Sequence, residues 1–172
     1  MEEALLKKID EISDEMISGI KRVVQIDSVQ SEAKPGMPFG EGVNKALEEA
    51  LKLARELGFE TENVDHMVGI AKYGQGEDYI GIMGHLDVVP VGEGWNHPPF
   101  SAYEDENGRI FARGILDNKG PTLSCLYALY AIKELKIQLK CPVYILFGTN
   151  EETGFEDLTH FLKVRKPPIM GW

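Results

Sequence analysis

A histidine and an aspartate stand two positions apart in the segment GHLDVVP at 84–90, a spacing that could serve a metal ion. Positions two apart in an extended backbone point to the same side, so His85 and Asp87 can act together. An imidazole can bind a metal through one ring nitrogen while a nearby carboxylate accepts a hydrogen bond from the other, which orients the ring. Taken alone, the pair is more typical of a histidine in a surface turn.

Two further segments place carboxylates in glycine-bounded turns. In GILDNKG at 114–120, Asp117 could bridge two cations, although an acidic or amide residue here is more typical of a helix cap. In GTNEETG at 148–154, the adjacent Glu151 and Glu152 diverge and could divide the work. One glutamate could bind a metal while the other accepts a proton from water. Alone, this pair is more typical of a solvated acidic turn.

Considered together, the three segments favour a metal site. Each follows a predicted strand, and each is bounded by glycines. Open α/β sheets bind ligands in the crevice outside the carboxyl ends of their strands. One histidine with several carboxylates suits zinc or another first-row divalent ion.

Hydrophobic periodicity and turn signals predict the elements that must position these segments. Apolar residues at helical spacing predict helices over 3–26, 43–57, 155–164 and from Pro121 onward. Short apolar runs predict strands near 59–64, 67–73, 78–84, 109–113 and 142–148. This order indicates an α/β fold, with a mixed, mostly parallel sheet flanked by helices.

The composition narrows the class of protein. The 172 residues suit one domain, and the net charge of −10 disfavours binding to nucleic acid. The N-terminus lacks the apolar region of a secretory signal, and no run approaches the roughly 18 apolar residues of a membrane span. Two cysteines, Cys125 and Cys141, fit a reducing compartment, so we expect a cytoplasmic protein that does not bind membranes.

In this order, the three segments resemble the co-catalytic metallopeptidases of the acetylornithine deacetylase, succinyl-diaminopimelate desuccinylase, carboxypeptidase G and aminoacylase superfamily. The sequence looks most like the PepV-like (Sapep-like) bacterial dipeptidases. The matching text is PFGEG at 38–42, GIMGHLDVVPVGEGW at 81–95, GRIFARGILDNKGPT at 108–122 and ILFGTNEETG at 145–154.

The resemblance implies a role for each candidate residue. His85 and Glu152 would bind different metals, and Asp117 would bridge the two ions, most simply zinc, with manganese or cobalt as alternatives. Glu151 would be the general base, and Asp87 would orient His85. The resemblance also implies a cis peptide bond between Asp117 and Asn118.

The sequence departs from the family pattern in length. Family members carry a further aspartate ligand downstream, a histidine ligand near a distant C-terminus, and an inserted lid domain, none of which can be assigned within residues 1–172. We therefore expect the chain to be the N-terminal portion of a catalytic domain whose sheet is incomplete at its C-terminal side. The exposed sheet edge could then pair two copies in a homo-oligomer.

Three functions stay open at this stage. The resemblance favours metal-dependent hydrolysis of short peptides, most simply dipeptides, by the full-length parent, with these residues inactive alone. A deacylase of N-acyl amino acids is the second possibility, and a non-catalytic truncated remnant is the third.

Overall fold

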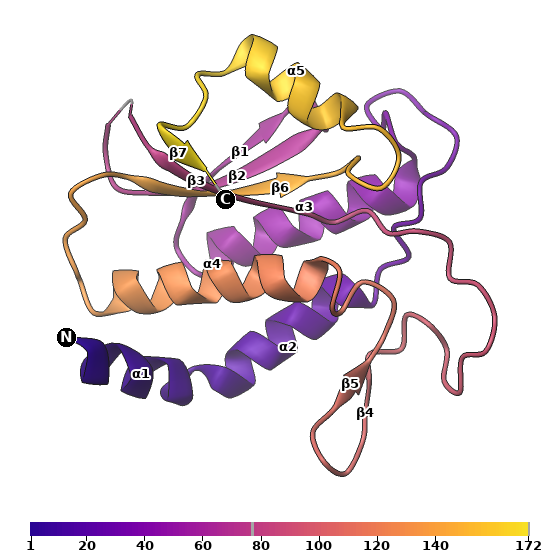
Figure 1. Cartoon of the computed structure of the whole chain (residues 1–172), viewed down its shortest axis with the longest axis horizontal. Helices are drawn as coiled ribbons and strands as arrows, with labels where there is room; N and C mark the ends of the chain where they lie inside the picture. The colour runs from indigo at the N-terminus through magenta and orange to yellow at the C-terminus, as the bar shows by residue number, and fades with distance from the viewer. Residues whose placement is uncertain (77, 172) are drawn as a thin grey trace.

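A mixed sheet forms the centre of the part of the chain that the computed structural model describes, residues 1–76 and 78–171 (Figure 1). Its strands lie in the order β1-β2-β6-β3-β7. The strand bounds are Glu60–Val64 for β1, Val68–Tyr73 for β2, Ile80–His85 for β3, Val143–Gly148 for β6 and Met170–Gly171 for β7. Strands β1, β3, β6 and β7 run in one direction and β2 in the opposite one. The expected α/β fold with a mixed, mostly parallel sheet is confirmed.

Helices cover both faces of the sheet (Figure 1). On one face, α3 packs on β1 and β2, while α4 packs on β3 and β6. Helices α1 and α2 form a further layer outside them, and α5 lies on the opposite face. The helix bounds are Glu2–Glu11 for α1, Ser13–Val24 for α2, Glu41–Glu56 for α3, Lys119–Glu134 for α4 and Glu156–Val164 for α5. Within the described residues, none of these helices combines the length and the apolarity needed to cross a membrane.

Strand β6 shows how the alternation of side chains builds two cores. Ile145 and Phe147 are buried in the large cluster between the sheet and the helices α1 to α4. Leu146, which lies between them in sequence, points to the other face and packs with Phe161 of α5. Because neighbouring positions of a strand face opposite sides, a strand covered on both faces is apolar throughout.

The helix predicted over 3–26 is wrong at one point, because the structure divides it into α1 and α2 at Ile12. The backbone of Ile12 leaves the helical region, with φ −101° and ψ 6°. The hydroxyl of Ser13 donates a hydrogen bond to the carbonyl oxygen of Asp10 over 2.9 Å. Such local side-chain bonds compete with the helical ladder. The apolar stripe continues across the break, since Ile12 and Ile20 both belong to the large core.

Helix α4 begins at Lys119, two residues before the start that was predicted at Pro121. Proline is tolerated there because N–H groups of the first turn have no partner within the helix. The strand predicted at 109–113 is the short β5, Ile110–Phe111, which pairs with β4, Tyr103–Glu104, rather than with the central sheet. The β4–β5 hairpin projects from the body of the molecule (Figure 1).

The register of β3 and β6 brings the three candidate segments to one edge of the sheet. The two strands are parallel neighbours, and His85 at the end of β3 lies opposite Gly148 at the end of β6. Helix α4 forms the crossover between them, so its first residues lie at the same edge. The chain therefore leaves β3 and β6, and enters α4, close to one point.

Candidate metal centre

The structure brings together the three residues that were predicted to bind metal. His85 ends β3, Asp117 lies just before α4, and Glu152 follows β6. One ligand-type atom from each of these residues lies within 4.8 Å of the others. An imidazole and two carboxylates at this spacing form a donor set that suits zinc, manganese or cobalt.

His85 lies among acidic groups. Its Nδ1 is 3.0 Å from the backbone oxygen of Asp87 and 3.4 Å from the carboxylate of Asp87. Its Nε2 is 3.1 Å from Asp117 Oδ1 and 3.6 Å from Glu151 Oε2. Burial opposes the charged imidazolium, but the hydrogen bonds to Asp87 and the negative charges of Asp87 and Glu151 together outweigh it and raise the pKa of His85 to about 9. The Nδ1 side is thus held by Asp87, and Nε2 faces the ligand-type carboxylates.

Asp87 contacts the glutamate pair as well as His85. The side chain is buried, at 1% exposure, and its two oxygens accept the backbone N–H groups of Glu151 and Glu152 over 3.2 and 3.0 Å. The residue that sequence reasoning paired with the imidazole therefore also fixes the backbone that carries both glutamates. A charged acceptor strengthens such bonds.

A cis peptide bond joins Asp117 to Asn118, as the resemblance implied. The Asp117 side chain is 75% exposed, so its carboxylate is open to a ligand. Asn118 is the residue before α4, and its side-chain oxygen accepts a hydrogen bond from the Thr122 hydroxyl. Gly84 of β3 lets this helix start approach so closely, because a Cβ at that position would collide with Thr122 and Asn118.

The glutamates differ in their surroundings. The Glu151 side chain is 42% exposed and reaches toward His85. Burial raises the pKa of the Glu152 carboxyl; His85 acts in the opposite direction, and the negative charges of Asp117, Glu151 and Asp87 raise it further. A carboxylate that lies among three other negative charges is in a site that a cation would stabilise.

Lys119 stands two positions after Asp117 in the sequence, and in the structure its side chain lies in the interior of the protein. Its side chain is fully buried, and its Nζ donates a hydrogen bond to the carbonyl oxygen of Ile26 over 2.7 Å. Burial lowers the pKa of Lys119 to about 7, although the charges of Asp27 and Asp87 act in the opposite direction. Its ammonium is therefore directed to the backbone of the segment after α2.

Sequence reasoning missed two residues that hold the glutamate turn, Asn150 and Asp157. Both are buried, and Asp157 accepts backbone N–H groups from the end of β6. The available signal was weak. An aspartate in the first turn of a helix reads as an ordinary cap, and nothing in the sequence says that this helix folds back onto the turn.

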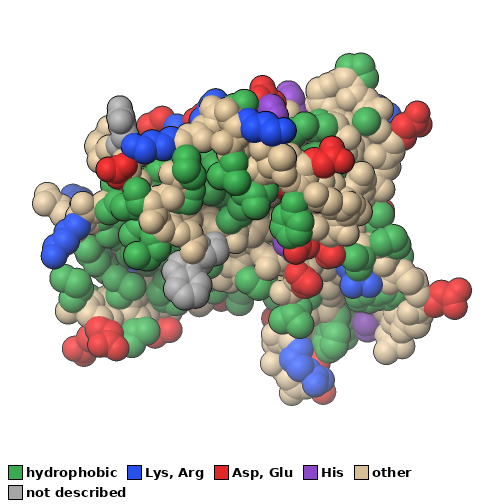
Figure 2. Space-filling view, turned by 45° about the horizontal axis from the view of Figure 1, so that its top comes forward, with side chains coloured by type: hydrophobic (Ala, Val, Ile, Leu, Met, Phe, Trp, Pro, Cys, Tyr) green, Lys and Arg blue, Asp and Glu red, His purple; other side chains and the backbone are tan. Residues whose placement is uncertain are grey.

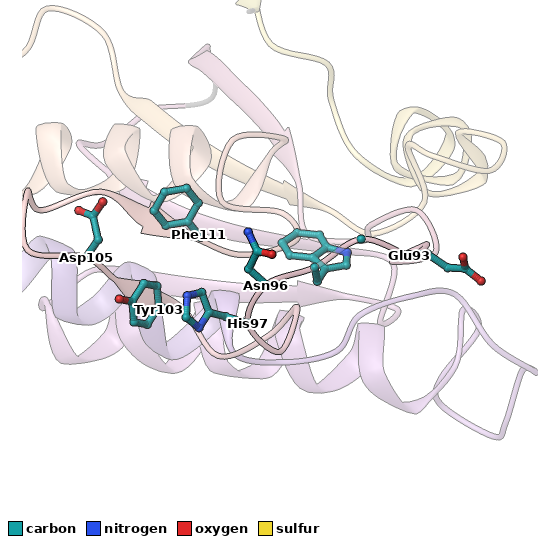
Figure 3. A pocket seen from close by; sticks show the side chains of 8 residues that line it. Glu93, Asn96, His97, Tyr103, Asp105 and Phe111 are labelled. Carbon is teal, nitrogen blue, oxygen red and sulfur yellow. The ribbon is translucent and has the colours of Figure 1, made fainter.

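A cavity of about 250 Å³ opens at this centre, and its lining includes His85, Asp117, Glu151 and Asp157. A different cavity, of about 410 Å³, lies between residues 93–97 and the β4–β5 hairpin (Figure 3). Its side chains are aromatic and acidic, with Trp95, Tyr103 and Phe111 among them, and the candidate ligands are not part of its lining. Two of the three candidate ligands, His85 and Asp117, therefore line the smaller cavity together with Glu151, while Glu152 belongs to the cluster but not to this lining.

Comparison with known proteins identifies the family. The model of peptidase family M20/M25/M40 matches residues 81–169, a range that contains every candidate site residue. The chain belongs to this family. Residues across almost the whole chain also match a Bacillus subtilis protein named "Putative dipeptidase YtjP", with 43% identity over 92% of this chain and 35% of that protein.

Two solved structures agree with the fold. Human carnosine dipeptidase 1 superimposes with a TM-score of 0.78 and 25% identity, over 94% of this chain and 37% of that one. The M20 family metallo-carboxypeptidase Sso-CP2 from Sulfolobus solfataricus gives a TM-score of 0.73 and 26% identity, over 87% and 34%. The chain thus spans about a third of the length of the family members that it matches.

Proposed function

We propose that residues 1–172 are the N-terminal portion of the catalytic domain of a metal-dependent dipeptidase. Family membership supports a metallopeptidase, and the similarity to a protein named as a dipeptidase supports dipeptides as the substrate class. The observation that carries the proposal is the cluster of His85, Asp117 and Glu152, with ligand-type atoms within 4.8 Å of one another. Glu151 lies beside this cluster.

Two divalent ions are proposed, with zinc as the first choice and manganese or cobalt as alternatives. His85 and Glu152 would bind different ions, and Asp117 would contact both. When bound, such ions polarise a peptide carbonyl and lower the pKa of water. Ligand chemistry discriminates weakly among these metals, so their identity has to be measured.

The protein residues supply orientation and proton transfer in this proposal. Asp87 is buried beside Nδ1 of His85, which directs Nε2 toward the cavity. Glu151 reaches the same cavity with a half-exposed carboxylate, where it can accept a proton from the attacking water and pass it to the leaving amine. The adjacent glutamates thus take different roles, one as base and one as ligand.

The test uses this chain and, where its reading frame continues, the longer protein. Each is loaded with zinc, manganese or cobalt and offered a panel of dipeptides and N-acyl amino acids. We expect the longer protein to hydrolyse dipeptides, and residues 1–172 alone to bind metal weakly without useful turnover. The cytoplasmic location predicted from the sequence stays a prediction.

Three outcomes would change the proposal. A preference for N-acyl amino acids would favour a deacylase. No hydrolysis of either class by the metal-loaded longer protein would contradict a peptidase. Turnover by residues 1–172 in the usual enzyme range of about 1–1000 per second, abolished by Glu151→Ala, would show that these residues suffice.

A further inference from the structure

Two buried aspartates hold four consecutive backbone N–H groups at the end of β6. Asp157 Oδ2 accepts the N–H groups of Thr149 and Asn150 over 2.6 and 3.1 Å. Asp87 accepts the next two, from Glu151 and Glu152, over 3.2 and 3.0 Å. The backbone that carries the glutamate pair is therefore fixed by one carboxylate from the segment after β3 and one from α5.

Asp157 occupies a place that favours such a role. The residue lies in the first turn of α5 and is 1% exposed. It lines the same cavity as His85, Asp117 and Glu151. Its second oxygen accepts the N–H of Leu158 over 2.7 Å, so both oxygens of the carboxylate are engaged by the backbone.

Asn150 holds the C-terminal end of the loop that carries the two glutamates. Its side-chain oxygen accepts the N–H of Glu156 over 3.0 Å, and its backbone oxygen accepts the N–H of Phe155 over 2.8 Å. Asn150 thus donates its backbone N–H to Asp157 and accepts the N–H groups of Phe155 and Glu156, which links the residues after β6 to the start of α5. The loop that contains both glutamates is tied at its two ends.

We propose that Asp157 is a positioning residue for the glutamate turn, an inference that rests on the metal-dependent function proposed above. Asp157 fixes the amides of Thr149 and Asn150, which places the amides of Glu151 and Glu152 on Asp87 and so sets the direction of both glutamate side chains. Hydrogen bonds from backbone N–H groups to a buried carboxylate are strong and directional. Groups of this kind that support metal ligands change metal affinity by about 10- to 100-fold when they are removed.

The experiment separates position from charge with three substitutions of Asp157. Asp157→Ala removes the acceptor. Asp157→Asn keeps an uncharged acceptor oxygen for the amides of Thr149 and Asn150 but gives up the bond from Leu158, and Asp157→Glu keeps the charge but displaces it by one methylene. Asp105→Ala is the matched control, because Asp105 also accepts two backbone N–H groups, from Asn107 and Arg109, but in the β4–β5 hairpin.

Two readouts are measured on the purified chain: zinc affinity by calorimetry, and amide hydrogen exchange at residues 149–152 without metal. We expect Asp157→Ala and Asp157→Glu to weaken zinc binding by about tenfold or more and to speed amide exchange, while Asp157→Asn stays within a few-fold of the parent. Asp105→Ala should change neither readout at these residues.

Several outcomes would overturn the role of Asp157. The first is a folded Asp157→Ala variant with the zinc affinity and amide exchange of the parent. The second is an Asp157→Glu variant with parent zinc affinity while Asp157→Asn binds zinc more weakly, which would make the charge of Asp157, and not its position, the cause. If Asp157→Ala does not fold, the Asn and Glu variants decide. Absence of zinc binding by the parent chain would contradict the proposed metal centre, whereas the exchange of residues 149–152 in metal-free variants would still test the role of Asp157.

Discussion

The turn after β6 and the β4–β5 hairpin use the same local bond but differ in how their charge is balanced. In the hairpin, one oxygen of Asp105 accepts two backbone N–H groups, and the other accepts the guanidinium of Arg109 over 2.7 Å. Asp157 makes the equivalent pair of bonds after β6, but its other oxygen meets a backbone N–H.

The surroundings extend this difference. The hairpin supplies its own cation, Arg109, whose guanidinium pairs with Asp105 and also lies over the ring of Phe111. At the candidate metal centre, Lys119 donates to the backbone oxygen of Ile26, and the carboxylates of Asp87, Asp117 and Glu151 share the imidazole of His85. Acidic residues thus indicate a site for an external cation where the fold leaves their charge unbalanced, and a structural turn where it does not.

The largest effect is expected from Glu151→Gln in a preparation that hydrolyses dipeptides. Loss of a general base should reduce kcat by about 100- to 10,000-fold, since the amide cannot accept a proton. Metal content should stay unchanged, which is checked by elemental analysis of the same sample. Glu93→Gln, in the other cavity, is the control and should keep parent activity. An equal loss of kcat in Glu151→Gln and Glu93→Gln would contradict the assignment of catalysis to the cavity that Glu151 lines.

Glu152→Ala should change metal content, in contrast to Glu151→Ala. Removal of a ligand is expected to release one ion, whereas removal of the base leaves both in place. Elemental analysis after dialysis measures the difference, and Asp105→Asn tests whether any aspartate or glutamate substitution has the same effect. Equal metal content in the two glutamate variants would contradict the division of roles.

Gly84→Ala should have an intermediate effect, because a Cβ there would collide with Thr122 and Asn118 at the start of α4. Overpacking of this kind costs about 1–3 kcal/mol of unfolding free energy, and the shift should also weaken zinc binding through the neighbouring Asp117. Gly154→Ala is the matched control, since its Cβ would meet its neighbours at 3.5 Å or more. Denaturant unfolding and zinc titration of both variants measure the effect, and equal stability would refute the packing argument.

Self-association through β7 should be the smallest effect. This two-residue strand forms one edge of the sheet, and Met170 is 57% exposed. Figure 2 shows hydrophobic side chains gathered over a broad area of one face. Met170→Lys should weaken dimerisation measured by analytical ultracentrifugation, because charge on an edge strand opposes pairing. Leu6→Lys, at a similarly exposed position of α1, should leave dimerisation unchanged. Equal dimerisation of the Met170→Lys and Leu6→Lys variants would exclude the β7 edge as the contact.

The sequence predicted the order of elements and the three segments that meet at the sheet edge. Strand periodicity and the positions of His85 and the glutamate pair directly after β3 and β6 carry that information, because the carboxyl ends of parallel neighbours meet. The expectation is wrong for Asp117, because the strand before it is β5 of the separate hairpin, and Asp117 reaches the edge at the start of α4. The resemblance added the cis bond at Asp117. These features are local or depend on a simple topological rule.

Other features depend on tertiary contacts that no local pattern encodes. The break at Ile12 coincides with the hydrogen bond from the Ser13 hydroxyl to Asp10, and the apolar stripe does not reveal it because both halves of the helix share that stripe. The roles of Asn150 and Asp157 need α5 to fold back over the end of β6. The second role of Asp87 needs the register that puts His85 opposite Gly148.

The position of bound zinc tests the central claim most directly. Crystals of the zinc-loaded chain, measured at the zinc absorption edge, would reveal each ion by its anomalous signal. We predict one zinc ion beside His85 Nε2 and a second beside the Glu152 carboxylate, each about 2.0–2.2 Å from its ligand, with oxygens of Asp117 close to both. Ordered zinc elsewhere, for example beside His97 in the hairpin cavity, with none at the β3–β6 edge, would contradict the assignment.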